Sequence, residues 1–186
     1  MSDIPFWTKP KTIKLKDETR ITLRPSKKTD LDPLWTMFNT LSKETLQYLP
    51  DPITRERVES WFKEIDYNTA LPILSIIKEN TGTRVISSAS LTFQKGIYSH
   101  KARFGITIHD DYQNRGLGHI LTGYMIEVAK ERGIKKVELS AVAHNQRAIH
   151  LYDKFGFKQE GYTKMDHWNP ILERYGDSVH MGRILP

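Results

Sequence analysis

Residues Ala102 to Gly118, ARFGITIHDDYQNRGLG, carry the clearest secondary-structure pattern of this chain. Apolar and polar side chains alternate between residues 102 and 109, which predicts a strand. The two glycines near its end open a helical pattern of apolar residues that continues to Gly133. A second alternating segment follows at residues 137–143. A strand, a helix and a strand in this order predict a crossover between two roughly parallel strands.

Further strands and helices surround this crossover. The same periodicities predict strands at residues 20–25, 72–78, 84–93, 157–168 and 178–185, and helices at residues 31–38, 55–65 and 145–155. Asn80-Thr81-Gly82 predicts a hairpin turn, whereas residues 42–52, which contain two prolines, predict an irregular loop. Strands joined by hairpins are antiparallel. We therefore expect an α/β fold with a mixed sheet and helices on both faces.

Length and composition exclude several classes of protein. The 186 residues are 38% hydrophobic and 27% charged, which is typical of one globular domain. The absence of cysteine excludes disulfides, thiolate metal sites and cysteine nucleophiles. The seven histidines include no His-x-x-x-His pair with a nearby carboxylate, so we expect no metal site. No apolar run is long enough to cross a membrane and no signal pattern is visible, so we expect a cytoplasmic protein.

The net charge of +6 lies mostly at one end of the chain. The first 28 residues carry eight basic and three acidic side chains, while the remaining 158 carry 20 and 19. Residues 1–18 are therefore expected to form a basic arm, either loosely held or an edge strand, and residues 19–186 the main domain. Aromatic residues do not interleave with the basic ones beyond Phe6 and Trp7, so we do not expect a nucleic-acid partner.

The first motif with chemical meaning lies where the predicted strand meets the helix. Its residues are Gln113, Asn114, Arg115, Gly116, Leu117 and Gly118. A helix start exposes unpaired backbone N–H groups, and glycines let a ligand approach them, which favours phosphate binding. A tight strand-to-helix turn explains the glycines equally well. The pattern matches neither a Walker loop nor a dinucleotide fingerprint.

A second motif follows one strand and helix later, between Asn145 and Phe157. Asn145 predicts a helix cap and Gly156 a helix end, with Tyr152 two turns inside. Together the two motifs resemble the GNAT superfamily of N-acetyltransferases, whose patterns are Gln/Arg-x-x-Gly-x-Gly/Ala and Asn-x-x-Ala-x-x-Leu-Tyr-x-Lys-x-Gly-Phe. The positions that match are Gln113, Gly116, Gly118, Asn145, Ala148, Leu151, Tyr152, Lys154, Gly156 and Phe157. Asp110 departs from the pattern, because proline is common there.

The resemblance covers about residues 19 to 185 and implies both a fold and a cofactor. The fold is a mixed, mostly antiparallel sheet of about seven strands, with helices on both faces and a splayed pair of parallel strands. The cofactor is acetyl-CoA, which acts as a co-substrate. The implied cofactor-binding residues are Ile106, Thr107, Ile108, Gln113, Asn114, Arg115, Gly116, Leu117, Gly118, Asn145, Tyr152 and Lys154.

The resemblance also implies a direct attack of an amine on the thioester. Tyr152 takes the place of the family's proton donor to the departing thiolate, and the backbone N–H of Ile108 would hold the oxyanion. The family's usual glutamate is missing from the strand at 102–109. Among side chains we expect Glu138 to act as the general base, with Glu44 as the second candidate and an exposed His109 as the third; a chain of water molecules is the alternative.

Several alternatives stay open in the sequence. The acceptor is a primary amine of a small molecule or of a protein, and the sequence does not choose between them. A non-catalytic acetyl-CoA-binding sensor or a basic-armed nucleic-acid-binding module on the same fold is the alternative function. A homodimer is also left open.

Overall fold

The computed structural model describes residues 4–49, 51–79 and 82–186. The strands are β1 (Lys11–Lys14), β2 (Arg20–Pro25), β3 (Ala70–Glu79), β4 (Gly82–Phe93), β5 (Lys101–Ile108), β6 (Lys136–Val142), β7 (Lys158–Asn169) and β8 (Arg174–Ile184). The α-helices are α1 (Leu31–Asn39), α2 (Lys43–Leu46), α3 (Arg55–Lys63), α4 (Leu117–Glu131) and α5 (Gln146–Lys154). Short 3-10 turns are η1 (Phe6–Thr8), η2 (Lys28–Asp30), η3 (Gly96–Tyr98) and η4 (Asp110–Tyr112).

The strands form one sheet in the order β1-β2-β3-β4-β5-β6-β8-β7. Every neighbouring pair is antiparallel except β5 and β6, which are parallel across α4 as the crossover predicted. The eighth strand is β1, the edge-strand alternative for the basic arm. The hairpin turn predicted at Asn80-Thr81-Gly82 falls in part on residues 80 and 81, which lie outside the described residues.

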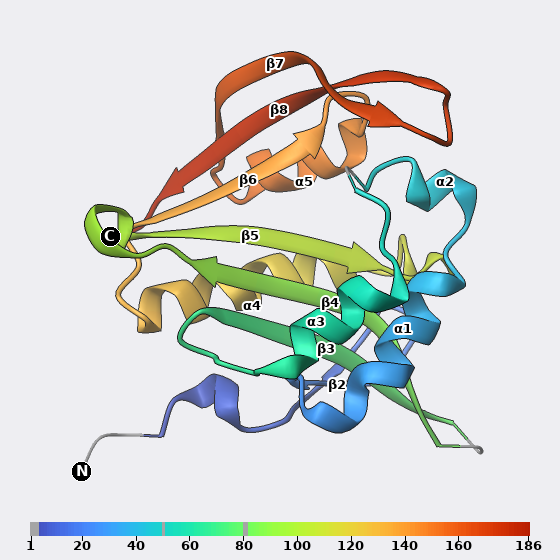
Figure 1. The fold of residues 1–186 in the computed structure, drawn as a ribbon. Coiled ribbons are helices and arrows are strands. Elements are labelled where there is room, and N and C mark those ends of the chain that lie inside the picture. Colours follow the sequence, from blue (N-terminus) through green and yellow to red (C-terminus); the bar gives the residue numbers. More distant parts are fainter. Residues whose placement is uncertain (1–3, 50, 80–81) are drawn as a thin grey trace.

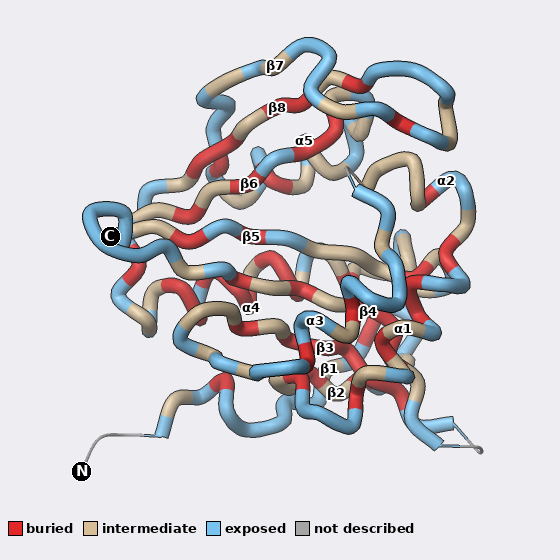
Figure 2. The backbone as a smooth tube through the Cα atoms, in the orientation of Figure 1, coloured by how far each residue is buried: buried red, intermediate tan, exposed pale blue. Residues whose placement is uncertain are grey.

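Helices cover both faces of the sheet, which confirms the predicted layering (Figure 1). On one face α1 and α3 bury Leu34, Phe38 and Val58 against β3 and β4. On the other face α4 buries Leu121 and Met125 in a larger core that reaches β8. In Figure 2 the buried segments follow β3, β4 and α4, whereas most of β7 is exposed. The apolar side chains of the strands and helices therefore form two cores, one on each face of the sheet.

The parallel strands β5 and β6 separate soon after they pair. Their register contains only the pairs Lys101–Lys136, Ala102–Val137 and Arg103–Glu138. Beyond Arg103 the two strands diverge like a V, and its open end faces α2 (Figure 1). The second half of β5 therefore has a strand partner on the β4 side only, among the described residues. The splayed pair that the family resemblance implied is confirmed.

The loop between α1 and α3 is more ordered than the prolines predicted. Residues 43–46 form α2, a single helical turn, and the Ser42 hydroxyl caps it by accepting a hydrogen bond from Thr45 N at 3.3 Å. The prediction of an irregular loop over residues 42–52 was wrong for this part. A cap residue followed by one turn leaves too few apolar positions for a periodicity to be visible.

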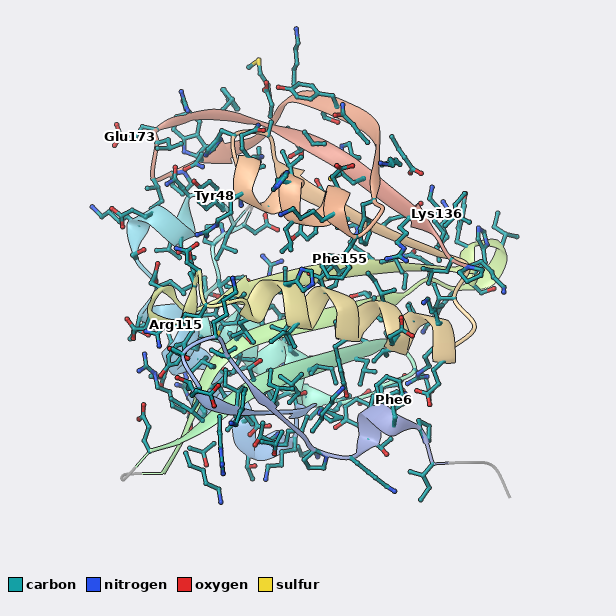
Figure 3. The ribbon with its side chains drawn as sticks, turned by 180° about the vertical axis from the view of Figure 1, so that it is seen from behind. Phe6, Tyr48, Arg115, Lys136, Phe155 and Glu173 are labelled. Carbon is teal, nitrogen blue, oxygen red and sulfur yellow. The ribbon has the colours of Figure 1, made fainter. Side chains whose placement is uncertain are left out.

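The basic arm is packed along α4 from one end of the helix to the other. Phe6 N donates to Glu131 Oε1 at 3.2 Å, and the Phe6 ring meets Tyr124 edge to face at 5.4 Å. Trp7 and Leu15 are buried in the same core as α4. In Figure 3 the arm runs from Phe6, near the end of α4, towards Arg115 at its start. The arm's Trp7 and Leu15 share a core with residues of the main domain.

Candidate active site

The predicted phosphate motif lies at the start of α4. Gly116 caps the helix with a φ of 88°, and Asn114 has a φ of 60°, so the chain turns sharply before the first helical N–H groups. A Cβ atom on Gly118 would come within 3.3 Å of Leu151 and 3.5 Å of Ile108. Gly118 is therefore needed for close packing between α4, α5 and β5, whereas Gly116 is needed for the left-handed turn.

Gln113 ties this loop to its surroundings. Its Nε2 donates to Thr45 Oγ1 at 2.8 Å and to Ile108 O at 3.0 Å, while its Oε1 accepts from Arg147 Nη2 at 2.6 Å. Arg147 Nη1 also donates to Asn114 Oδ1 at 3.1 Å. Arg147 could not be predicted as part of this site from the sequence, because nothing in its spacing shows that α5 brings it to a loop 33 residues away. The side chain of Gln113 thus holds α2, β5 and α5 around the loop.

In the second half of β5, some backbone N–H groups point into the V between β5 and β6. His109 N donates to Ile86 O on β4 at 2.9 Å. Successive residues of a strand point their N–H groups to opposite sides, so the N–H groups of Ile106 and Ile108 point away from β4, towards the side of β6. Ile106, Thr107 and Ile108 are all half-buried. This unpaired edge is able to accept an extended chain as an additional strand.

Tyr152 lies buried beside this edge, with its ring against Phe104 of β5 and Phe157 at centroid distances of 6.1 and 5.9 Å. Burial raises the pKa of the Tyr152 hydroxyl to about 12. Asn145 caps α5 as predicted, because its Oδ1 accepts from Ala148 N at 3.2 Å. Lys154 is exposed in the last turn of the same helix. The structure therefore brings Tyr152 to the side of β5 and leaves Lys154 near the surface.

Glu138 lies at the closed end of the V, in the last register pair that joins β5 and β6. Its Oε1 is 2.9 Å from Lys101 Nζ and 3.1 Å from Lys136 Nζ. Burial raises the pKa of Glu138, but the hydrogen bonds and charges of the two lysines outweigh it and lower the pKa. The carboxylate is thus held ionised in a cluster of charges, away from the open end of the V.

The open end of the V collects a different set of side chains. His144 follows β6 by two residues, and its ring lies 5.4 Å from that of Tyr48, which follows α2 (Figure 3 labels Tyr48). The His144 side chain is exposed, but partial desolvation lowers its pKa, and the charges of the nearby Arg174 and His167 lower it further. Asn169 of the β7–β8 hairpin donates to Gln47 O at 2.8 Å. Three segments far apart in the sequence therefore border this opening.

The two other candidates for the base have different surroundings. His109 is buried, with Nε2 3.2 Å from Thr40 Oγ1, so the expectation of an exposed histidine was wrong. Thr40, directly after α1, and Arg84 of β4 contact its ring, and the strand pattern does not reveal these contacts. Glu44 is exposed on α2.

The contacts of Asp110 show why an aspartate stands where the family pattern often has proline. Its carboxylate accepts from Ser42 N at 2.9 Å and from the hydroxyls of Ser42 and Thr45, each at 2.5 Å. Burial raises the pKa of Asp110, but these hydrogen bonds outweigh it and lower the pKa. A proline would supply no acceptor here, so the aspartate anchors α2 to the end of β5.

The described residues contain neither a metal-binding cluster nor a membrane-spanning helix. Over residues 4–49, 51–79 and 82–186, no group of three histidine, aspartate or glutamate side chains is arranged to hold a metal ion. Within the same ranges no helix has the length and apolar character needed to span a bilayer.

Comparison with known proteins agrees with this geometry. A family model described as the acetyltransferase (GNAT) domain matches residues 20–158. A putative phosphinothricin acetyltransferase, YwnH of Bacillus subtilis, is 23% identical over 76% of this chain and 86% of its own. The L-amino acid N-acetyltransferase AaaT of Escherichia coli is 37% identical over 46% of this chain and 52% of its own. The [ribosomal protein bS18]-alanine N-acetyltransferase of Escherichia coli is 31% identical, and the chain spans about 62% of its length.

Solved structures extend the likeness to the whole fold. The GNAT domain of S. lividans PAT has a TM-score of 0.77 at 18% identity, and it covers 98% of this chain and 100% of that one. A spermidine N-acetyltransferase from Vibrio cholerae, solved with CoA and spermine, has a TM-score of 0.73 at 21% identity over 88% and 95%. GNAT acetyltransferases use acetyl-CoA as the acetyl donor. The family model covers well over half of the sequence, so this chain belongs to the GNAT family of acetyltransferases.

Proposed function

We propose that this protein transfers the acetyl group of acetyl-CoA to a primary amine, by direct attack of the amine on the thioester in a ternary complex. The observation that carries the proposal is the V between β5 and β6, with the N–H of Ile108 on its inner side. The helix start at Gly116 is tied to the same strand through Gln113. One opening thus joins a phosphate-binding loop to a reaction centre.

The residues of this chain suit acetyl-CoA at each part of the molecule. The backbone N–H groups after Gly116 would bind the diphosphate, favoured by the positive end of the α4 dipole. The free edge of β5 at Ile106 and Ile108 would pair with the pantetheine arm, whose amides match a strand edge. Asn145, at the start of α5, and Lys154 would contact the arm and a phosphate. When bound, the thioester supplies an activated acetyl carbonyl.

Two groups would stabilise charge during the transfer. The N–H of Ile108 donates to the carbonyl oxygen as it becomes negative. The Tyr152 hydroxyl donates to the departing sulfur. With a pKa of about 12 the hydroxyl remains protonated throughout, whereas a thiol has an ordinary pKa of about 8.5. Full proton transfer from Tyr152 to the thiolate is therefore uphill, and we propose that Tyr152 acts mainly as a hydrogen-bond donor.

An alkyl amine is mostly protonated at neutral pH, so a group near the opening must accept its proton. Glu138 remains a prediction for this role. Its surroundings make it a weaker base, because two lysines lower its pKa. We propose His144 in its place. It lies at the open end of the V, and its lowered pKa keeps the imidazole neutral at neutral pH. The proton would pass to His144 directly or through water.

The absence of cysteine gives the proposal a direct test. A thiol-reactive dye in the assay would report only CoA released from acetyl-CoA, because the chain itself has no thiol. A panel of an L-amino acid, an alanine peptide and spermidine follows the acceptors named for the relatives. We expect at least one amine to give thiol release and an N-acetylated product by mass spectrometry. Tight acetyl-CoA binding without release from a wide amine panel would instead favour the sensor alternative.

A further inference from the structure

We propose that the turn between β1 and β2 forms one wall of the cofactor's phosphate site, and that Lys16 is its phosphate-binding side chain. The inference rests on the proposed function and extends it to the basic arm. The GNAT family model begins at residue 20, so the turn lies outside the part of the chain that it matches.

The turn contacts the phosphate loop through its backbone and through two side chains. The Cγ and Cε atoms of Lys16 lie 3.6 Å from the position that a Cβ atom on Gly116 would take. Lys16 N approaches Arg115 O at 3.5 Å, and Asp17 Oδ2 lies 2.7 Å from Arg115 Nη1. The Lys16 stem therefore lies flat on the loop at the start of α4. Lys16 is exposed, and its ammonium is one bond beyond Cε, so it is close enough to reach a group bound at this loop.

This placement is fixed by the fold of the arm. Leu15 is buried in the main core, and Leu15 N donates to Thr19 O at 3.0 Å across the turn. Glu18 has a φ of 63° and its N–H donates to Leu15 O at 3.1 Å, which closes the turn tightly. The ladder between β1 and β2 sets the register. Lys16 thus projects from an anchored turn, so less conformational freedom is lost when it binds an anion.

The positive charges around the loop favour the binding of an anion. Lys16, Arg115 and Arg147 meet there with the positive end of α4. Hydrogen bonds from Thr19, and then the charge of Arg115, lower the pKa of Asp17, so Asp17 is ionised and pairs with Arg115. Arg147 contacts only neutral acceptors, and Lys16 has no ion-pair partner, among the described residues. A bound phosphate would relieve the repulsion between these positive groups.

The test compares Lys16→Met with Lys14→Met. Methionine keeps the aliphatic contact with Gly116 and removes the ammonium, whereas Lys14 lies in the same hairpin, paired with Glu18 at 2.5 Å. Isothermal titration measures Kd for CoA, dephospho-CoA and pantetheine at low and at physiological salt. For Lys16→Met we expect a Kd for CoA raised about five- to tenfold, with a smaller effect at higher salt. Lys14→Met should bind CoA like the wild type, and Lys16→Arg should restore most of the affinity.

Comparing the three ligands shows which phosphate Lys16 binds. An equal loss for CoA and dephospho-CoA assigns Lys16 to the diphosphate, and a loss for CoA alone assigns it to the 3′-phosphate. Pantetheine, which has neither group, should bind both variants equally. A Lys16→Met protein that binds CoA as tightly as the wild type would overturn the inference, and so would an equal loss for pantetheine. A wild-type protein that fails to bind CoA at all would overturn the proposed function itself.

Discussion

Burial decides what the Tyr152 hydroxyl can do. The ring packs between Phe104 and Phe157, and this apolar site raises the pKa of the hydroxyl to about 12. The position of Tyr152 in its motif could be read from the sequence. The pKa of its hydroxyl could not be read from the sequence, because the aromatic neighbours come from β5 and from the chain after α5.

Tyr152→Phe should lower kcat about 10- to 100-fold, the value of one hydrogen bond to a charged group, and leave the Kd for acetyl-CoA nearly unchanged. Because the pKa of Tyr152 is about 12, no limb of the wild-type pH–rate profile below about pH 10 should come from this residue. Stopped-flow thiol release and titration calorimetry give the two quantities.

Tyr124→Phe is the matched control. Tyr124 is also buried, its pKa is also raised to about 12, and its hydroxyl has no hydrogen-bond partner among the described residues. Its loss should leave kcat unchanged. Equal rates for the Tyr152→Phe variant and the wild type would remove Tyr152 from the mechanism.

The two candidates for the base should separate in their pH–rate profiles. In the proposed mechanism His144 accepts a proton when neutral, and its pKa is lowered, so kcat/KM should rise with pH through a pKa below 6.5 and then level off. His144→Gln should remove this limb and lower kcat/KM about 100-fold. Glu138→Gln should leave the limb in place. A limb that survives in His144→Gln and disappears in Glu138→Gln would instead support Glu138.

At the scale of elements, α2 is held by another element rather than by its own length. One helical turn is too short to be stable alone, and Asp110 of η4 accepts three hydrogen bonds from Ser42 and Thr45. The sequence revealed that Asp110 was unusual for the family pattern. Its partners lie 65 and 68 residues away, so its role as an anchor became visible only in the folded chain.

Asp110→Ala should therefore disturb the amine side of the site more than the cofactor side. Leaving the partners of Asp110 unsatisfied costs about 1–3 kcal/mol, so we expect a lower urea midpoint and a KM for the amine raised at least fivefold. The Kd for CoA should change less than twofold. Asp111→Ala, which removes an exposed neighbouring carboxylate paired with Arg84, is the control. An unchanged amine KM would show that α2 does not border the acceptor.

At the scale of the whole molecule, the basic arm joins the two ends of α4. Trp7 is buried and packs on the Arg132 guanidinium at 4.7 Å, while Lys16 lies over Gly116 at the other end of the helix. The division into an arm of residues 1–18 and a domain of residues 19–186 stays a prediction. It can be tested by the stability of the whole chain.

Trp7→Ala should lower the free energy of unfolding by about 3–5 kcal/mol, because it removes a large buried side chain and its contact with Arg132. Urea unfolding followed by circular dichroism measures the change, with the exposed Ile4 replaced by alanine as the control. A single shifted transition would mean that arm and domain unfold together. An unchanged midpoint would mean that the arm contributes nothing to the stability of the domain.

The amino-acid sequence is enough to predict the crossover from residue 102 to residue 143, the glycine turn before α4 and the cap of α5. These features depend on local backbone sterics and side-chain periodicity, which neighbouring residues specify. Folding alone brings Arg147, Lys16 and Asp17 together at the loop before α4, and His144 to Tyr48 at the open end of the V. Those contacts join segments up to about 100 residues apart. They arise from strand order and helix packing, which no local pattern encodes.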